Sequence, residues 1–168
     1  MSDASSPITD ALALSGIACA AASLEDVSTC DPMNIDKRGK MSYAALLSGI
    51  TLANAGLGVV HGFASSIGGL FDIPHGVLCG TMLPEAVRVS MQEAFKDKPR
   101  NDWMIRKYVT LGEVVYGISS GKDEKTCSAL SDYFFKLKET LKLPGLSQFG
   151  VAFADAENLV ARHGWRAV

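Results

Sequence analysis

The sequence predicts an all-α fold: a single helical domain of about seven helices. Three observations carry this prediction. Apolar residues recur at helical spacing through most of the chain. No segment of five or more residues shows the flanked alternation of apolar and polar residues that marks a half-buried strand. The length of 168 residues fits one compact domain, and 48% apolar residues suffice for a core.

In the first half of the chain, caps followed by proline predict where helices begin. Ser6 and Pro7 place a hydroxyl cap before a first-turn proline, so a helix is expected to start there and to fade near residues 23–28. Cys30-Asp31-Pro32 is a second start of this kind, and its helix is expected to reach about residue 55. The predicted buried positions in that helix include Tyr43, Leu46, Leu47, Ile50 and Leu52.

Glycine and proline also divide the rest of the chain. Gly56 and Gly58 break the helical pattern, and a short helix is expected over residues 59–66. Asp72-Ile73-Pro74 predicts the next start, with Asp72 as the N-cap. A charged loop is then expected over residues 96–100, followed by helices over residues 101–116, 123–141 and 153–162.

The composition excludes several classes of protein. The apolar share and a charged share of 20% are typical of a globular domain and not of a disordered chain. A net charge of −2 and a pI of about 5.9 provide no basic surface for nucleic acid, so no nucleic-acid partner is expected. The four cysteines form no C-x-x-C pair and no secretory signal precedes them, which predicts reduced thiols in a cytoplasmic protein.

The segment over residues 41–71 contains no Asp, Glu, Lys or Arg. A segment of that length could cross a bilayer. It holds six glycines, however, and few of the large aliphatic residues that face lipid. We therefore expect the buried centre of a helical domain and no membrane span.

Two histidines within an apolar region are the strongest chemical signal. His61 and His75 lie 14 residues apart, and each is followed by a glycine that leaves room for a ligand. Imidazole is a common ligand of Zn, Fe and Ni, so the pair predicts part of a metal site. Catalytic sites usually take three or more protein ligands. Asp10, Asp72 and Glu85 could supply a carboxylate, but no spacing selects one of them.

Two weaker patterns carry no assignment by themselves. Ser65 lies four residues after His61 on the same helical face, but neither an acidic partner nor an oxyanion element accompanies it. Gly56-x-Gly58 follows a helix and lacks the third glycine of a dinucleotide-binding loop. The residues therefore assign no catalytic residue and no cofactor-binding residue.

The stretch from Asn54 to Gly76 (NAGLGVVHGFASSIGGLFDIPHG) resembles the iron-containing (group III) alcohol dehydrogenases, specifically their C-terminal helical domain. The segment SPITDALAL from Ser6 and the pair Leu83-Pro84 are similar to segments of the same family. These motifs cover about residues 5–90. The resemblance implies the helical C-terminal fold of the dehydroquinate synthase-like and iron alcohol dehydrogenase enzymes.

The resemblance also implies a chemistry. Family members pair an NAD(P)-binding α/β domain with a helical domain that holds Fe²⁺ or Zn²⁺ through an aspartate and three histidines. His61 and His75 match the last two histidines. By motif position Leu52 and Ser65 border the substrate pocket, and many members have a proton-relaying histidine where Ser65 stands. The metal polarises the oxygen of a small alcohol or aldehyde while hydride passes to or from NAD(P).

Compared with the family, the chain is expected to be a truncated metal-binding helical domain over residues 1–168. The N-terminal NAD(P)-binding domain and two of the metal ligands are expected to be absent. We therefore expect weak metal binding, no NAD(P) binding and no activity of the isolated chain. Two alternatives stay open: a fragment of a zinc-type glycerol dehydrogenase-like enzyme, and a non-catalytic helical association domain. A homodimer is a further expectation, because family members are often dimers or larger.

Overall fold

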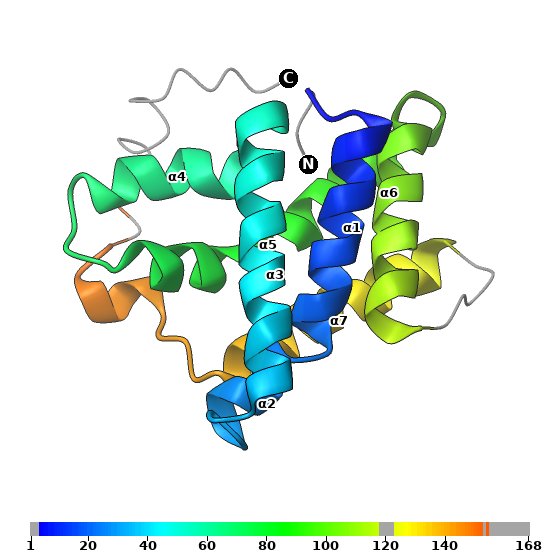
Figure 1. Ribbon diagram of the computed structural model, residues 1–168. Helices are drawn as coiled ribbons and strands as arrows, with labels where there is room; N and C mark the ends of the chain where they lie inside the picture. The colour runs from blue at the N-terminus through cyan, green and yellow to red at the C-terminus, as the bar shows by residue number, and fades with distance from the viewer. Residues whose placement is uncertain (1–3, 118–122, 153, 155–168) are drawn as a thin grey trace.

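The computed structural model describes residues 4–117, 123–152 and 154. Within these residues it contains seven α-helices, one short 3-10 helix and no strand, so the all-α prediction is confirmed (Figure 1). The predicted helix over residues 153–162 lies outside the described part. The elements are α1 (Pro7–Ala21), α2 (Leu24–Thr29), α3 (Ile35–Ala55), α4 (Val59–Gly68), α5 (His75–Lys96), α6 (Lys98–Tyr116), α7 (Asp123–Thr140) and η1 (Leu146–Phe149).

Helix α1 begins where the sequence predicts. The Ser6 hydroxyl accepts a hydrogen bond from the Thr9 amide at 3.3 Å, and the Thr9 hydroxyl accepts one from the Ser6 amide at 2.8 Å. This reciprocal capping box satisfies two backbone donors that the helix leaves without partners. The helix lies between α3 and α6 in Figure 1 and packs on both.

Helix α3 packs mainly on α1, and this determines which of its residues are buried. A Cβ added to Gly16 of α1 would lie 3.4 Å from the Cβ of Leu47, which shows how closely the two helices approach. Leu47 is buried as predicted, but Tyr43, Leu46, Ile50 and Leu52 are exposed, so that part of the prediction is wrong. The helical period groups residues on a face, but only the packing partners decide which face is covered.

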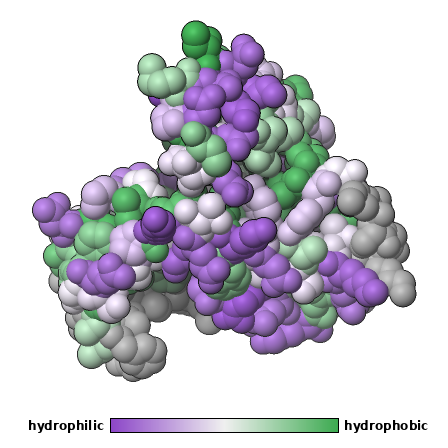
Figure 2. All heavy atoms as spheres, turned by 90° about the horizontal axis from the view of Figure 1, so that it is seen from below, coloured by the Kyte–Doolittle hydropathy of each residue, from purple (hydrophilic) through white to green (hydrophobic). Residues whose placement is uncertain are grey.

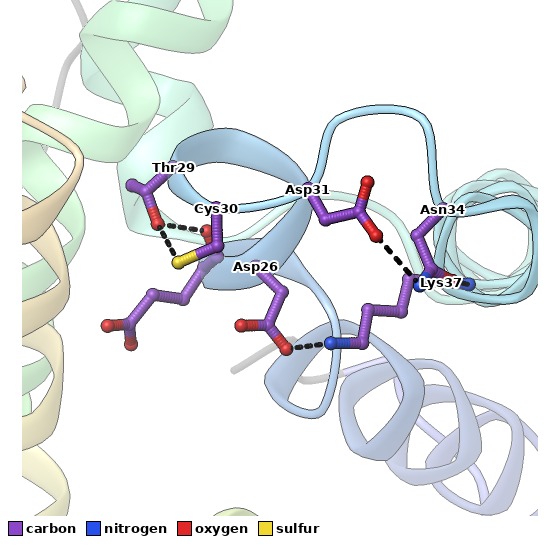
Figure 3. A network of polar contacts seen from close by, with 7 residues as sticks. Asp26, Thr29, Cys30, Asp31, Asn34 and Lys37 are labelled. Atoms are coloured by element: carbon purple, nitrogen blue, oxygen red, sulfur yellow. Dashed lines mark hydrogen bonds and ion pairs between the residues drawn. The ribbon is translucent and has the colours of Figure 1, made fainter.

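The region before α3 differs from the sequence prediction in two ways. A short helix, α2, occupies the stretch where α1 was expected to fade. The N-cap of α3 is Asn34 and not Asp31; its side chain accepts a hydrogen bond from the Lys37 amide at 3.0 Å. Figure 3 shows that the Asp31 carboxylate instead accepts a bond from the Asn34 amide group, while the Lys37 ammonium donates to Asp26 of α2.

Helices α4 and α5 form the part of the fold that carries the histidines. Gly56, with a φ of 71°, ends α3 in a conformation that favours glycine, and α4 begins three residues later. Helix α5 begins at His75 with Pro74 as N-cap, so the expected Asp72 cap is wrong; Asp72 is exposed. Proline restricts the residue before it and fits a helix start without a side-chain cap.

A first hydrophobic core joins α4, α5 and η1. Its buried members are Ala64, Ile67, Ile73 and Leu78. The chain after α7 closes this core, because the Thr81 hydroxyl of α5 donates to the Pro144 carbonyl at 2.9 Å and η1 packs on the same cluster. The core therefore holds the first turns of α4 and α5 in fixed relation.

A second core lies between α5, α6 and α7. Its buried members are Val87, Met91, Tyr108, Cys127 and Leu130. The prediction of a charged loop over residues 96–100 is wrong, because only Asp97 separates α5 from α6. The Asp97 side chain accepts a hydrogen bond from the Arg100 amide and so caps α6. This cap was missed because the charged residues around Asp97 were interpreted as a loop.

The surface agrees with a globular domain. Seen from the end where α2 lies, hydrophilic residues cover much of the molecule, and smaller hydrophobic patches lie among them (Figure 2). In the described residues no single helix has the length and hydropathy of a membrane span. Only α3 and α4 taken together pass that test, and they meet at a bend of 95°.

Candidate metal centre

The fold brings His61 and His75 together. His61 lies in the first turn of α4 and His75 is the first residue of α5. Their ring centroids are 5.5 Å apart and the ring planes are tilted by 46°. His61 is partly buried, whereas His75 is exposed. Two imidazoles from different helices therefore face a common space.

Cys79 joins the two histidines. It lies one turn after His75 on α5, and its Sγ atom is 3.5 Å from the Nε2 atom of His75. One donor atom from each of His61, His75 and Cys79 can be chosen so that all three lie within 4.8 Å of one another. Burial raises the pKa of the Cys79 thiol. From the sequence Cys79 was expected to be an ordinary reduced thiol, although its i, i+4 spacing to His75 was a signal that could have found it.

The carboxylates considered as ligands do not join the two histidines. Asp10 forms an ion pair with Lys107 at 2.8 Å, and Glu85 forms one with Arg88 at 2.7 Å. Asp72 is exposed. None of the three belongs to the group of converging donor atoms.

A cavity of about 490 Å³ opens beside His61. Helices α1, α3 and α6 and the start of α4 form its walls. Leu52 lies on the α3 wall, and Lys107 lies on the α6 wall, where its ammonium donates to the Ser5 hydroxyl and pairs with Asp10. This cavity is large enough for a small organic molecule next to an imidazole.

A smaller cavity of about 310 Å³ also has His61 in its lining. His61, Cys79, Ser90 and Tyr108 are the polar side chains among its otherwise apolar lining. Tyr108 is buried, and this burial raises the pKa of its phenol. His61 therefore lines both cavities.

Ser65 does not take part in this arrangement. Its hydroxyl donates to the backbone carbonyl of His61 at 3.0 Å, and it lines neither of the two cavities. Such a bond to the carbonyl four residues earlier is an ordinary helical use of serine.

The donor set fits a divalent transition metal, since two imidazoles and a thiol are ligands of Zn²⁺ and of its neighbours in the first row. NAD(P) is a different case. The part of the chain that the structure describes contains no strand, so it offers no strand–glycine loop–helix unit of the kind that binds a dinucleotide.

Comparison with known proteins agrees with the fold. The family model for the C-terminal part of the iron-containing alcohol dehydrogenases matches residues 1–165. The chain belongs to the iron-containing alcohol dehydrogenase family. The resemblance seen in the sequence is therefore confirmed.

Relatives and solved structures of the family match nearly the whole chain. Alcohol dehydrogenase 4 of Saccharomyces cerevisiae strain S288c is 36% identical over 166 residues, which is 97% of this chain and 39% of the yeast protein. The 1,3-propanediol dehydrogenase of Klebsiella pneumoniae is 33% identical over 89% of this chain and 36% of its own length. A crystal structure of 1,3-propanediol oxidoreductase superposes with a TM-score of 0.83 at 27% identity, covering 96% of this chain and 40% of that one.

The chain thus spans about two fifths of the length of the relatives that it matches. It corresponds to the helical C-terminal part of the iron-containing alcohol dehydrogenases and is similar to known alcohol and propanediol dehydrogenases.

Proposed function

We propose that this chain is the metal-binding half of an NAD(P)-dependent alcohol dehydrogenase that interconverts small alcohols with aldehydes or ketones. The observation that carries the proposal is the contact between His61 and His75, since residues 14 apart in sequence present their rings to one space. The match to the C-terminal family model supports the reaction class. The domain would act together with an NAD(P)-binding domain, which supplies the hydride acceptor.

In this proposal His61 and His75 hold Fe²⁺ or Zn²⁺. When bound, such an ion supplies Lewis-acid polarisation of the substrate oxygen. Imidazoles bind metal through an unprotonated ring nitrogen, and His61 and His75 each offer one such nitrogen to the ion. The chain's contribution to binding is therefore to keep two imidazole donors oriented by α4 and α5.

The larger cavity is the proposed substrate pocket. Leu52 on α3 would contact the carbon chain of the substrate, because it presents an apolar side chain on the wall of the cavity that also contains His61. Ser65 would border the pocket only through its position beside His61, whose carbonyl it binds. A pocket with mainly apolar walls removes water from the reacting carbon and favours small, weakly polar alcohols.

The test joins this chain to the segment of Saccharomyces cerevisiae alcohol dehydrogenase 4 that precedes the matched region. We expect the fusion to oxidise NADH in the presence of small aldehydes after loading with Fe²⁺ or Zn²⁺. His61→Ala and His75→Ala should each reduce turnover to background and lower metal content, while Cys30→Ser, at an exposed cysteine, should change neither.

Two results would contradict the proposal. One is a folded, metal-loaded fusion that oxidises no NADH with any small aldehyde. The other is turnover that survives both histidine substitutions. The chain by itself is expected to oxidise no NADH in the same assay.

A further inference from the structure

Cys79 lies where a third ligand to the proposed metal would lie. His75 and Cys79 are one turn apart on α5, and His61 projects from the neighbouring helix α4, which lies beside α5 in Figure 1. Among the residues that the structure describes, His61, His75 and Cys79 are the one group of three His, Cys, Asp or Glu side chains whose donor atoms converge within 4.8 Å.

The distances are close to those of a tetrahedral site. With bonds of about 2.1 Å to nitrogen and about 2.3 Å to sulfur, a tetrahedral metal separates N and S by about 3.6 Å and two nitrogens by about 3.4 Å. The Sγ atom of Cys79 and the Nε2 atom of His75 are already 3.5 Å apart. A donor pair at the limit of 4.8 Å would need to close by about 1.4 Å, which side-chain rotation allows.

The charge of a bound divalent ion would also favour a thiolate. His61 and His75 lie in the first turns of two helices, where backbone N–H groups give a partial positive charge. Neutral imidazoles would leave a bound divalent ion with its full double charge beside these groups. A thiolate from Cys79 would reduce the net charge of the ion and its ligands by one. Thiolates also bind Zn²⁺ in preference to harder metal ions.

We propose that Cys79 is a third protein ligand, so that this chain by itself holds Zn²⁺ through His61, His75 and Cys79. On binding, the S–H bond breaks, its proton passes to water, and a sulfur–metal bond forms. His61 also lines both cavities, from which water or a substrate oxygen could reach the ion. The inference rests on the proposed histidine pair and adds a thiolate to it.

The experiment titrates the reduced, metal-free chain with Co²⁺, which replaces Zn²⁺ and reports its ligands by colour. We expect one equivalent to bind, with the visible bands of a tetrahedral ion and a near-ultraviolet thiolate-to-cobalt charge-transfer band. Zn²⁺ should displace Co²⁺ and remove both. Cys79→Ser should abolish the near-ultraviolet band and weaken binding by at least about 10-fold. Cys30→Ser is the matched control and should retain both band and affinity.

The histidine variants separate this inference from the proposed function. His61→Ala and His75→Ala should lose Co²⁺ binding while circular dichroism shows unchanged helix content. Co²⁺ bound without the charge-transfer band, and equally well by Cys79→Ser, would overturn the role of Cys79 and leave the histidine pair intact. Failure of the unchanged chain to bind Co²⁺ would overturn the inference, while the fusion enzyme would still test the proposed function. Binding that survives both histidine substitutions would overturn both.

Discussion

Leu78 tests whether the core between α4 and α5 stabilises the domain and orients the histidines. It has no solvent exposure and packs with Ala64, Ile67 and Ile73. A Cβ added to Gly68 of α4 would lie 3.9 Å from its Cδ2 atom, so the leucine fills the space between the two helices. Leu78→Ala removes three carbons, each contributing about 0.8 kcal/mol of transfer free energy.

A cavity is also left behind, because a packed core relaxes only in part. This adds about 1–2 kcal/mol, so the free energy of unfolding should fall by about 3–4 kcal/mol, near the middle of the range for such substitutions. For a domain of this size the melting temperature should fall by roughly 6–16 °C. Urea unfolding followed by circular dichroism measures the change, with the midpoint lowered at an unchanged slope.

Leu46→Ala is the matched control on α3. Leu46 is 60% exposed, so the same substitution should change the free energy of unfolding by no more than about 0.5 kcal/mol. Equal losses for the two variants would refute the reasoning, because they would show that the exposed face of α3 contributes as much as the core. A Leu78→Ala variant that keeps its stability would refute the assignment of Leu78 to that core.

Two further predictions concern the packing of α7. Gly112→Ala should lower the free energy of unfolding by about 1–2 kcal/mol, because the new Cβ would lie 2.7 Å from Cγ2 of Thr126. Gly49→Ala is the control: Gly49 has open space around it, so this substitution should raise the free energy of unfolding by up to about 1 kcal/mol. Burial raises the pKa of Cys127 from 9.0 to about 11, so its thiol should react with iodoacetamide far more slowly than that of the exposed Cys30.

The raised pKa of Cys127 also predicts how stability depends on pH. The unfolded chain ionises this thiol near its ordinary value of 9.0, whereas the folded chain does so near 11. The contribution of Cys127 is therefore fully present below pH 9 and is lost as pH rises through 11. Urea midpoints measured across this range should fall less in Cys127→Ala than in the unchanged chain. Equal falls would contradict the assignment of the raised pKa to Cys127. Equal changes in melting temperature for Gly112→Ala and Gly49→Ala would contradict the close approach of Gly112 to Thr126.

The sequence allowed most of the helices to be predicted, though not α2, because their signals are local. The Ser6 cap and the Gly56 break act through their own backbone and nearest neighbours, so they can be recognised without the fold. Burial in α3 could not be predicted, since Leu46 and Leu47 are adjacent and apolar but only Leu47 faces α1. Which face is covered depends on a helix more than twenty residues away.

The site divides in the same way. His61 and His75 stood out because each lies beside a glycine in a region, residues 41–84, whose one charged residue is Asp72. Their contact depends on how α4 packs on α5, which the sequence pattern does not show. Cys79 was missed for a related reason. Its spacing from His75 was visible, but only the position of His61 on the other helix makes that spacing a three-donor cluster.

The proposal that His61 and His75 hold one divalent ion is tested most directly by anomalous diffraction from crystals of this chain soaked in Zn²⁺. Data collected on both sides of the zinc absorption edge locate the ion independently of the protein atoms. We predict one strong peak within bonding distance of both imidazoles, about 2.1 Å from each nitrogen, with Cys79 Sγ about 2.3 Å away. A peak that touches neither imidazole, or no peak between α4 and α5, would contradict the assignment.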